Sequence, residues 1–435
     1  MQVTGSNLAA HFDACLARAL FPSQPGAAPL RLAVALSGGA DSLALTLLTQ
    51  AWAARHGAQL VALTVDHRLR DNSTAEAHAV AQQMAAHGIA HHILTPAHVP
   101  VSGNMQETAR SWRYAALAEA CVTHGILHCL VAHTAGDNRE TAAHNLARGA
   151  TADGASGMRC VRTLHGVRFL RPLLAVERAT LEAYLTGRGV AWMNDPSNDN
   201  PRFARVRTRA ALRDDAAKRA ALDAILAQQS AARTGRDAAL AEAAIRCVTL
   251  SPLGFADLNL AAWRALEPTL ASQLLADTLT TISGAAHRPR GGDTARLIAA
   301  LAQGDGRRRT LHGCELGAQQ GVVRIAREAA RVEAAITLRG RGETRWDNRF
   351  HVRYALPGDV AITLRALGSD GRQQARAAAA IAGEARPAPL PLATPSLWQG
   401  ETLVAIPHLL ARGEGGWPVQ LGFAPAKPLA AAPFW

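Results

Sequence analysis

The sequence predicts an α/β protein with a doubly wound parallel sheet in its N-terminal half, followed by a mainly helical domain and a small α+β C-terminal domain. Short apolar runs alternate with helical patterns from residue 31 to residue 148, an order typical of a parallel sheet with right-handed crossovers. A stretch rich in Ala, Leu and charged residues then extends from Ala220 to Arg246. Apolar runs of strand type return at 350–354 and 360–364.

The N-terminal half reads as four strands, each followed by a helix. The apolar runs place the strands at 31–36, 59–65, 91–94 and 127–132. Helical patterns place the helices at 43–52, 73–87, 105–124 and 137–148, and Ser73 is expected to cap the second of them. Ligands of such sheets bind beyond the carboxyl ends of the strands, so polar residues just after a strand are the first candidates for a site.

The chain is long enough for several domains. Its 435 residues suggest about three domains at ~150 residues each. Changes in composition place an N-terminal extension at 1–28, the α/β domain at 29–215, the mainly helical domain at 216–335 and the small C-terminal domain at 336–435.

The composition favours a polyanionic partner. The formal net charge is +12, and only two of the 46 basic residues are Lys. Arg has a planar fork that suits phosphate, so nucleic acid is a more plausible partner than a membrane. No apolar run approaches the ~20 residues of a membrane span, and no signal peptide is evident. Six scattered cysteines without a C-x-x-C pair indicate a reducing, cytoplasmic location without a zinc or iron–sulfur site.

A Gly/Ser loop joins the first predicted strand to its helix, and it reads Ser37-Gly38-Gly39-Ala40-Asp41-Ser42. Two glycines allow N–H groups to point inward, and the following helix adds its own N–H groups and dipole. The loop therefore predicts a phosphate or pyrophosphate pocket in which Ser37 and Ser42 donate hydrogen bonds. Asp41 could cap the helix or help to hold Mg²⁺. The spacing matches neither a Walker A loop nor a dinucleotide fingerprint.

Polar residues also follow two other predicted strands. Asp66 opens the segment 66–70 and could hold Mg²⁺ or a ribose, or belong to a plain polar turn. His133 could titrate near neutral pH or lie in the core. Asp137 and Glu140 are three residues apart, so they project from one side of the first helical turn. They suit either a cation or simple compensation of the helix dipole.

Two groups of arginines are candidates for anion contacts. Arg110 and Arg113 share a face of the helix predicted at 105–124 and repel each other unless an anion lies between them. A solvated pair beside Glu107 is the alternative. Beyond a turn at 195–198 follow Arg202, Arg205, Arg207 and Arg209, which form either a solvated basic face or a docking surface for RNA phosphates.

Together these motifs resemble those of the tRNA(Ile)-lysidine synthase family, within the PP-loop superfamily of N-type ATP pyrophosphatases. The similar segments are 37–42 (SGGxDS), 66–70 (DHxLR), 109–114 (AR-x-x-RY), 133–141 (H-x-x-D-D-Q-x-E-T) and 195–198 (D-x-SN). The resemblance implies an adenine-nucleotide α-hydrolase-like, Rossmann-type catalytic domain. It also implies tRNA binding by the two later domains, and homodimers occur in the family.

The resemblance further implies a reaction and a set of site residues. ATP would adenylate the oxygen at carbon 2 of the wobble cytidine in a CAU-anticodon tRNA(Ile), and the ε-amine of L-lysine would then displace AMP to give lysidine. The implied catalytic residues are Asp41, Arg113, Asp137 and Glu140, with Asp41 as a ligand of Mg²⁺. The implied contacts are ATP by Ser37, Gly38, Gly39, Ala40, Asp41, Ser42, Asp66, His67, Arg110 and His133, lysine by Asp137, Glu140 and Arg205, and tRNA by Arg202, Arg205, Arg207 and Arg209.

Two residues depart from the family pattern. Gly136 replaces the first Asp of the D-D pair, and Asn138 replaces the Gln. Gly136 cannot ligate a metal through a side chain, so Asp137 alone would have to serve. Two alternatives therefore stay open: a PP-loop tRNA-thiolating enzyme, which typically needs cysteine pairs, and a non-catalytic tRNA-binding relic, which Gly136 favours. An ATP-turnover assay with tRNA separates the relic from an enzyme.

Overall fold

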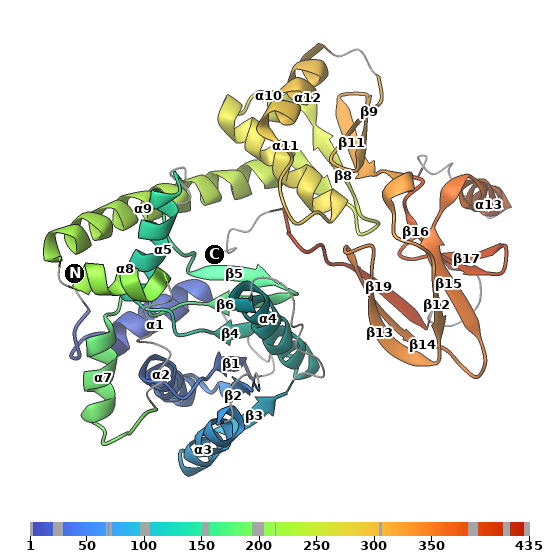
Figure 1. Cartoon of the computed structure of the whole chain (residues 1–435). Coiled ribbons are helices and arrows are strands. Elements are labelled where there is room, and N and C mark those ends of the chain that lie inside the picture. The colour runs from blue at the N-terminus through green and yellow to red at the C-terminus, as the bar shows by residue number, and fades with distance from the viewer. Residues whose placement is uncertain are drawn as a thin grey trace. The chain divides into compact units, whose positions relative to one another are not determined.

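A computed structural model describes residues 3–20, 29–66, 68, 72–95, 105–149, 156–193, 204–213, 215–303, 307–381, 390–411 and 418–429. The chain divides into two compact units, Met1–Arg236 with Pro433–Trp435 (unit 1) and Asp237–Ala432 (unit 2) (Figure 1). No helix in these described ranges is both long enough and apolar enough to cross a bilayer.

Unit 1 is built on a six-stranded sheet with the order β3-β2-β1-β4-β6-β5. Five strands run parallel, namely β1 (Arg31–Ala35), β2 (Gln59–Val65), β3 (Ala90–Leu94), β4 (His128–Leu130) and β6 (Val167–Leu170). The edge strand β5 (Val161–Leu164) pairs antiparallel with β6. The predicted parallel sheet is confirmed, with an added hairpin that the sequence patterns did not reveal.

Helices cover both faces of this sheet, because alternate residues of each strand point to opposite sides. Leu32 and Val34 pack against one group of helices, α1 (Leu8–Ala19), α2 (Ala40–His56), α3 (Ser73–Ala86) and α7 (Arg178–Thr186). Ala33 packs on the other face with α4 (Met105–Thr123). This arrangement is the doubly wound fold predicted from the alternation of strands and helices.

Three more helices belong to the region after β4. They are α5 (Ala135–Ala147), α8 (Ala204–Arg213) and α9 (Ala216–Cys247), the last of which continues into unit 2. Ala142 of α5, Leu212 of α8 and Leu222 and Leu226 of α9 form one small apolar cluster. Through it, α8 is held beside α5, the helix that carries Asp137 and Glu140.

One predicted cap is wrong. The N-cap residue of α3 is Asn72, and Ser73 is already the first helical residue. The Ser73 hydroxyl instead donates a hydrogen bond to Oδ1 of Asp66 at 2.8 Å. The Ser73 hydroxyl therefore bonds to the Asp66 carboxylate instead of capping the N-terminus of α3.

Unit 2 begins with a second sheet. The antiparallel order is β7-β8-β11-β10-β9, with β7 (Val248–Leu250), β8 (Phe255–Asn259), β9 (Arg309–Leu311), β10 (Cys314–Gln319) and β11 (Val322–Arg327). Helices α10 (Leu260–Arg264), α11 (Pro268–Ser283) and α12 (Gly291–Gln303) accompany it. The helices expected of a mainly helical domain are therefore present, together with a sheet that the sequence patterns did not reveal.

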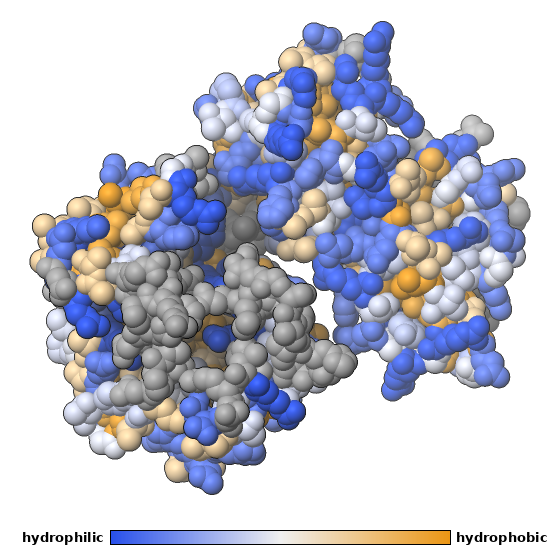
Figure 2. Space-filling view, in the orientation of Figure 1, coloured by the Kyte–Doolittle hydropathy of each residue, from blue (hydrophilic) through white to orange (hydrophobic). Residues whose placement is uncertain are grey.

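The rest of unit 2 carries a five-stranded and a three-stranded antiparallel sheet, in the orders β12-β15-β16-β17-β18 and β13-β14-β19. Their elements are η2 (Ala329–Arg331), β12 (Ile336–Arg339), β13 (Arg341–Trp346), β14 (Phe350–Ala355), β15 (Ala361–Ala366), α13 (Gly368–Ile381), β16 (Pro395–Gln399), β17 (Thr402–Ile406), β18 (Leu410–Ala411) and β19 (Val419–Phe423). On the face of unit 2 in Figure 2, hydrophilic side chains surround small hydrophobic areas.

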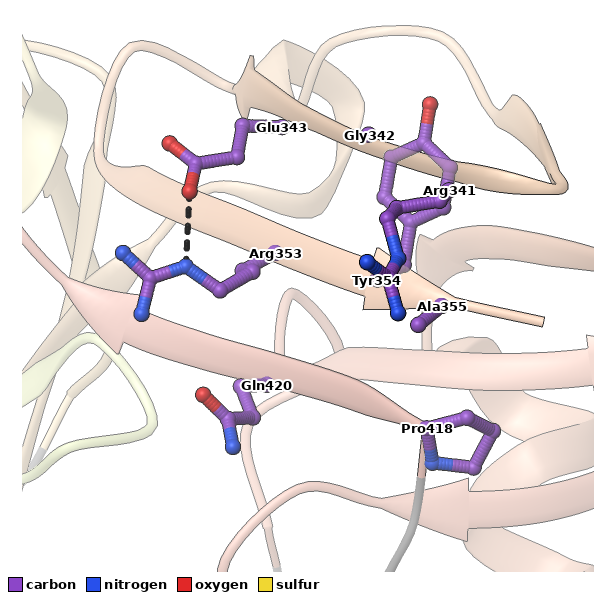
Figure 3. A pocket seen from close by; sticks show the side chains of 8 residues that line it. All are labelled: Arg341, Gly342, Glu343, Arg353, Tyr354, Ala355, Pro418 and Gln420. Atoms are coloured by element: carbon purple, nitrogen blue, oxygen red, sulfur yellow. Dashed lines mark hydrogen bonds and ion pairs between the residues drawn. The ribbon is translucent and has the colours of Figure 1, made fainter. Parts of the chain in front are cut away.

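An open pocket lies on the three-stranded sheet of unit 2 (Figure 3). Its lining comes from all three strands and their ends, and comprises Arg341, Gly342, Glu343, Arg353, Tyr354, Ala355, Pro418 and Gln420. The Glu343 carboxylate accepts a hydrogen bond from Nε of Arg353 at 2.7 Å across it. None of the predicted catalytic or ATP-binding residues lies here, since all of them belong to unit 1.

Candidate functional site

The Gly/Ser loop follows β1 and is held together by its own serines. Oγ of Ser42 accepts the N–H of Ser37 at 3.1 Å and donates to the carbonyl of Gly39 at 3.0 Å. Because that bond uses the Ser42 proton, the Ser37 hydroxyl is the donor in the 3.1 Å contact between the two side chains. Ser42 therefore shapes the loop, while the exposed Ser37 stands at its surface.

The backbone at Gly38 has no room for a side chain. Its φ is +83°, and a Cβ there would lie 2.2 Å from Cε of Met193 and 2.8 Å from Cγ2 of Val80. Its carbonyl also accepts the N–H of Met193 at 3.0 Å. The loop is thus fixed in shape where it meets α2, whose first N–H groups have no acceptor within the helix. Such a helix start binds phosphate.

Asp41 lies in the first turn of α2, and its Oδ1 is buried with no hydrogen-bond donor among the described residues. Burial raises the pKa of this carboxyl to about 6; Arg178 and Arg209 oppose the shift, and Asp137 and Glu182 add to it. A cation would satisfy the buried oxygen. The described residues contain no cluster of three or more metal-ligating side chains. Mg²⁺ usually binds one or two carboxylates together with substrate phosphates.

Asp66 holds the turn after β2. Its carboxylate accepts hydrogen bonds from Thr74 Oγ1 at 2.7 Å, Ser73 Oγ at 2.8 Å and the Arg68 N–H at 3.0 Å. Burial raises the pKa of Asp66, but these hydrogen bonds outweigh it, so the net pKa lies below its ordinary value. Asp66 is therefore ionised and already engaged in ordering this turn. His67 lies outside the described residues.

His133 follows β4 and is half-buried. Its Nδ1 accepts a hydrogen bond from Nε of Arg171 at 3.2 Å, so the neutral ring carries its proton on Nε2. Arg171 is itself buried and also donates to the carbonyl of Arg159 at 2.7 Å. The imidazole is thereby oriented at the carboxyl edge of the sheet.

Asp137 and Glu140 project from the start of α5 and share one cation. Oδ2 of Asp137 accepts the N–H of Thr134 at 2.9 Å, which fixes the helix start. Nε of Arg209 donates to Oε1 of Glu140 at 2.6 Å, and Nη2 of Arg209 lies 3.7 Å from Oδ1 of Asp137. Glu140 is only 5% exposed. Both carboxylates therefore converge on the Arg209 guanidinium.

Comparison with known proteins places this site in a family. Residues 10–216 match the family model described as a PP-loop domain. A tRNA(Ile)-lysidine synthase from Ruegeria pomeroyi is 34% identical over 421 residues, which cover 93% of each chain. This chain belongs to the tRNA(Ile)-lysidine synthase family. The family member from Hyphomonas neptunium is 36% identical over 316 residues, which cover 70% of this chain and 84% of that protein.

Solved structures also match part of this chain. The U34-tRNA thiolase NcsA from Methanococcus maripaludis matches with a TM-score of 0.42 and 14% identity, covering 52% of this chain and 76% of that chain. The PP-loop match implies that ATP is a substrate of unit 1. The predicted family and fold are thus confirmed.

The two departures from the tRNA(Ile)-lysidine synthase pattern have different surroundings. A Cβ added at Gly136 would meet only Thr134 Oγ1, at 3.7 Å, so the position has space for a side chain. Asn138 has a structural task, because its Oδ1 accepts the N–H of Met158 at 2.7 Å. A Cβ at Gly157 would lie 2.3 Å from the same oxygen. The Asn138 side chain, one methylene shorter than Gln, thus packs directly against the segment 157–158.

Arg139 is a residue of this site that the motif reading missed. It lies between Asp137 and Glu140 on α5, is 9% exposed, and donates from Nε to Oδ1 of Asp223 at 2.7 Å. Its two Nη atoms donate to both carboxylate oxygens of Glu177. Arg139 therefore ties α5 to α7 and α9. Its partners lie 38 and 84 residues away in sequence, so no local pattern could indicate them.

The structure describes the side chains of only some of the predicted arginines. Arg110 is half-buried on α4, with its guanidinium 5.5 Å from the ring centroid of Tyr114, and Arg113 is exposed one turn along. Arg209 is seated on Glu140 as described above. Arg202 and the side chains of Arg205 and Arg207 lie outside the described residues.

Proposed function

We propose that this protein ligates L-lysine to carbon 2 of the wobble cytidine in CAU-anticodon tRNA(Ile), using ATP and releasing AMP and pyrophosphate. One observation carries the proposal beyond family membership: the cation held by Asp137 and Glu140 lies within electrostatic range of Asp41. The phosphate loop and the cation-binding carboxylates therefore lie within electrostatic range of each other, as a reaction between a nucleotide and an ammonium-bearing substrate requires.

The first step adenylates the tRNA. Oxygen 2 of the cytidine attacks the α-phosphorus of ATP, and the bond between that phosphorus and the bridging oxygen breaks. The first N–H groups of α2 and the loop 37–42 hold the departing pyrophosphate. Asp41 would hold Mg²⁺, which neutralises phosphate charge when bound. Arg110 and Arg113, in the first half of α4, are proposed to contact the nucleotide.

The second step transfers lysine. Asp137 and Glu140 bind the ε-ammonium in the position that the Arg209 guanidinium takes in the free protein. A carboxylate accepts a proton from the ammonium. The free amine then attacks carbon 2, the bond from carbon 2 to oxygen breaks, and AMP leaves with that oxygen. Arg209 has to move away from the pair for this step, and a tRNA phosphate is a suitable new partner for it.

The remaining assignments follow the same proposal. Arg202, Arg205, Arg207 and Arg209 would contact tRNA, and Arg205 would also contact lysine. The segments 216–335 and 336–435 would bind other parts of the tRNA in the cytoplasm, and a homodimer remains a prediction. Thiolation is not favoured, because the curated relatives are named as lysidine synthases and the sequence holds no paired cysteines.

Release of AMP tests the proposed function. The protein is incubated with labelled ATP and Mg²⁺, with lysine and CAU-anticodon tRNA(Ile) added singly and together. We expect multiple-turnover AMP release only when both are present, its loss in Asp41→Asn, and its strong reduction at low lysine concentration in Glu140→Gln. tRNA binding without any AMP release would instead identify a non-catalytic tRNA-binding protein. AMP release that does not depend on lysine would indicate another acceptor.

A further inference from the structure

We infer that Arg162, on the edge hairpin β5–β6, belongs to a phosphate-binding surface that holds the tRNA backbone beside the catalytic pocket. The inference rests on the proposed function, because it takes tRNA as the substrate. It adds a contact from a segment, 161–170, that lies outside every motif of the sequence.

The strand register places Arg162 against a group of other side chains on the α4 face of the sheet. Arg162 is directly paired with Phe169, so both side chains point to the same face. Phe169 packs edge-on against Tyr114 of α4, with ring centroids 4.8 Å apart. The Tyr114 hydroxyl accepts a hydrogen bond from Nη2 of Arg171, and Arg110 lies over the Tyr114 ring. Three guanidinium groups therefore gather around one buried tyrosine.

These groups make the surface strongly positive. Burial lowers the pKa of Arg162, and the positive charges of Arg171 and Arg110 lower it further, although Tyr114 partly offsets them. Arginine does not lose its proton in proteins, so the mutual repulsion persists as a concentrated positive potential. Arg171 is buried and fixed on His133, whereas Arg162 is exposed. Arg162 is thus the member that can reach an anion outside the protein.

The position of Arg162 favours an RNA phosphate over the nucleotide. Val161 is paired with Leu170, the last residue of β6, so Arg162 lies near the carboxyl edge where the candidate site is. In the sheet, however, β5 is three strands from β1, roughly 14 Å at the usual strand spacing. The phosphates of ATP are bound by the loop after β1. A chain with many phosphates can reach both places, and the net charge of +12 favours such a partner.

The test compares variants of the full chain. Arg162→Gln removes the charge, and Arg162→Lys keeps it. Arg188→Gln is the matched control, because Arg188 is another exposed arginine of unit 1, stacked on Tyr184 at 3.8 Å. It follows the end of α7, away from the carboxyl edge where that helix begins. Binding of tRNA(Ile) is measured without ATP or lysine at several salt concentrations, and KM values for ATP and lysine follow at saturating tRNA.

We expect Arg162→Gln to raise the Kd for tRNA severalfold and to reduce the slope of log K against log salt by about 0.7, the loss of one single-strand phosphate contact. Arg162→Lys and Arg188→Gln should stay near wild type, and the KM for ATP should not change. An unchanged Kd and slope in Arg162→Gln would overturn the inference, as would a raised KM for ATP alone. Because tRNA binding is measured without ATP or lysine, its result can be interpreted even if the protein lacks the proposed ligase activity.

Discussion

Replacing Gly38 by Ala is the perturbation whose effect the structure defines most fully. An L-residue pays about 1–2 kcal/mol to adopt a left-handed conformation such as φ +83°. The new methyl would also overlap Cε of Met193 and Cγ2 of Val80. The Met193 side chain can turn aside, but the β-branched Val80 cannot do so easily, and overpacking of this kind costs about 1–3 kcal/mol. Together these terms predict a destabilisation of about 2–5 kcal/mol.

Gly57 provides the matched control at the opposite end of α2. It also has a positive φ, +63°, but a Cβ there would meet nothing within 4 Å. Gly57→Ala should therefore lose only the conformational part, about 1–2 kcal/mol. Urea unfolding followed by circular dichroism compares the two variants, and equilibrium binding gives the Kd for ATP. Gly38→Ala should unfold at clearly lower urea and bind ATP more weakly; equal unfolding curves for the two variants would refute the steric reasoning.

Three further predictions concern charged and titrating groups. Burial, with a contribution from Arg168, lowers the pKa of His128 to about 4 from 6.5. The folded state therefore loses about 3 kcal/mol as pH falls from above 6.5 toward 4, and His128→Gln should flatten that dependence in unfolding curves. Glu140→Gln should raise the KM for lysine about 10- to 100-fold, because an amide lacks the charge that holds an ammonium, while the KM for ATP stays constant. Arg139→Met should lower the free energy of unfolding by about 2 kcal/mol, since its partners Glu177 and Asp223 are partly exposed.

Two of these predictions have a control variant. Asp13→Asn breaks an ion pair with Arg55 that is 38–50% exposed, so it should change neither the KM for lysine nor the stability by much. Arg139→Lys keeps the charge without the paired hydrogen bonds and should fall between wild type and Arg139→Met. A pH dependence that His128→Gln leaves unchanged would place the titrating group elsewhere. A lysine KM that Glu140→Gln does not raise would remove Glu140 from the lysine site.

The parallel sheet was predictable because its signals are local. The strands β1 to β4 are short apolar runs, and the helices between them begin and end within a few residues of the predicted bounds, apart from α2, which is longer than predicted at both ends. The hairpin β5–β6 was not predictable in this way. Its strands have four residues each, and its tight turn depends on positive φ at His165 and Gly166. The sheet β7-β8-β11-β10-β9 was also missed, and its two edge strands, β7 and β9, have three residues each.

The candidate site was also predictable from the sequence only in part. Motif spacing brought Asp137 and Glu140 to one side of a helix, and the structure places both on a common cation. The identity of that cation, Arg209, was not predictable from spacing, because it lies 69 residues from Glu140. The hydroxyl of Ser73 likewise serves Asp66 rather than its own helix. In both cases a partner outside the helix that carries the side chain decided what that side chain does.

Transfer of labelled lysine to the wobble nucleotide tests the central claim most directly. The full-length protein is incubated with ATP, Mg²⁺, radiolabelled L-lysine and an unmodified CAU-anticodon tRNA(Ile) transcript, and the tRNA is digested to nucleosides. The account predicts label on the wobble cytidine, stable to mild base, dependent on ATP and strongly reduced in Glu140→Gln at subsaturating lysine. Label that mild base releases as an ester, or AMP release with no label on that nucleoside, would contradict it.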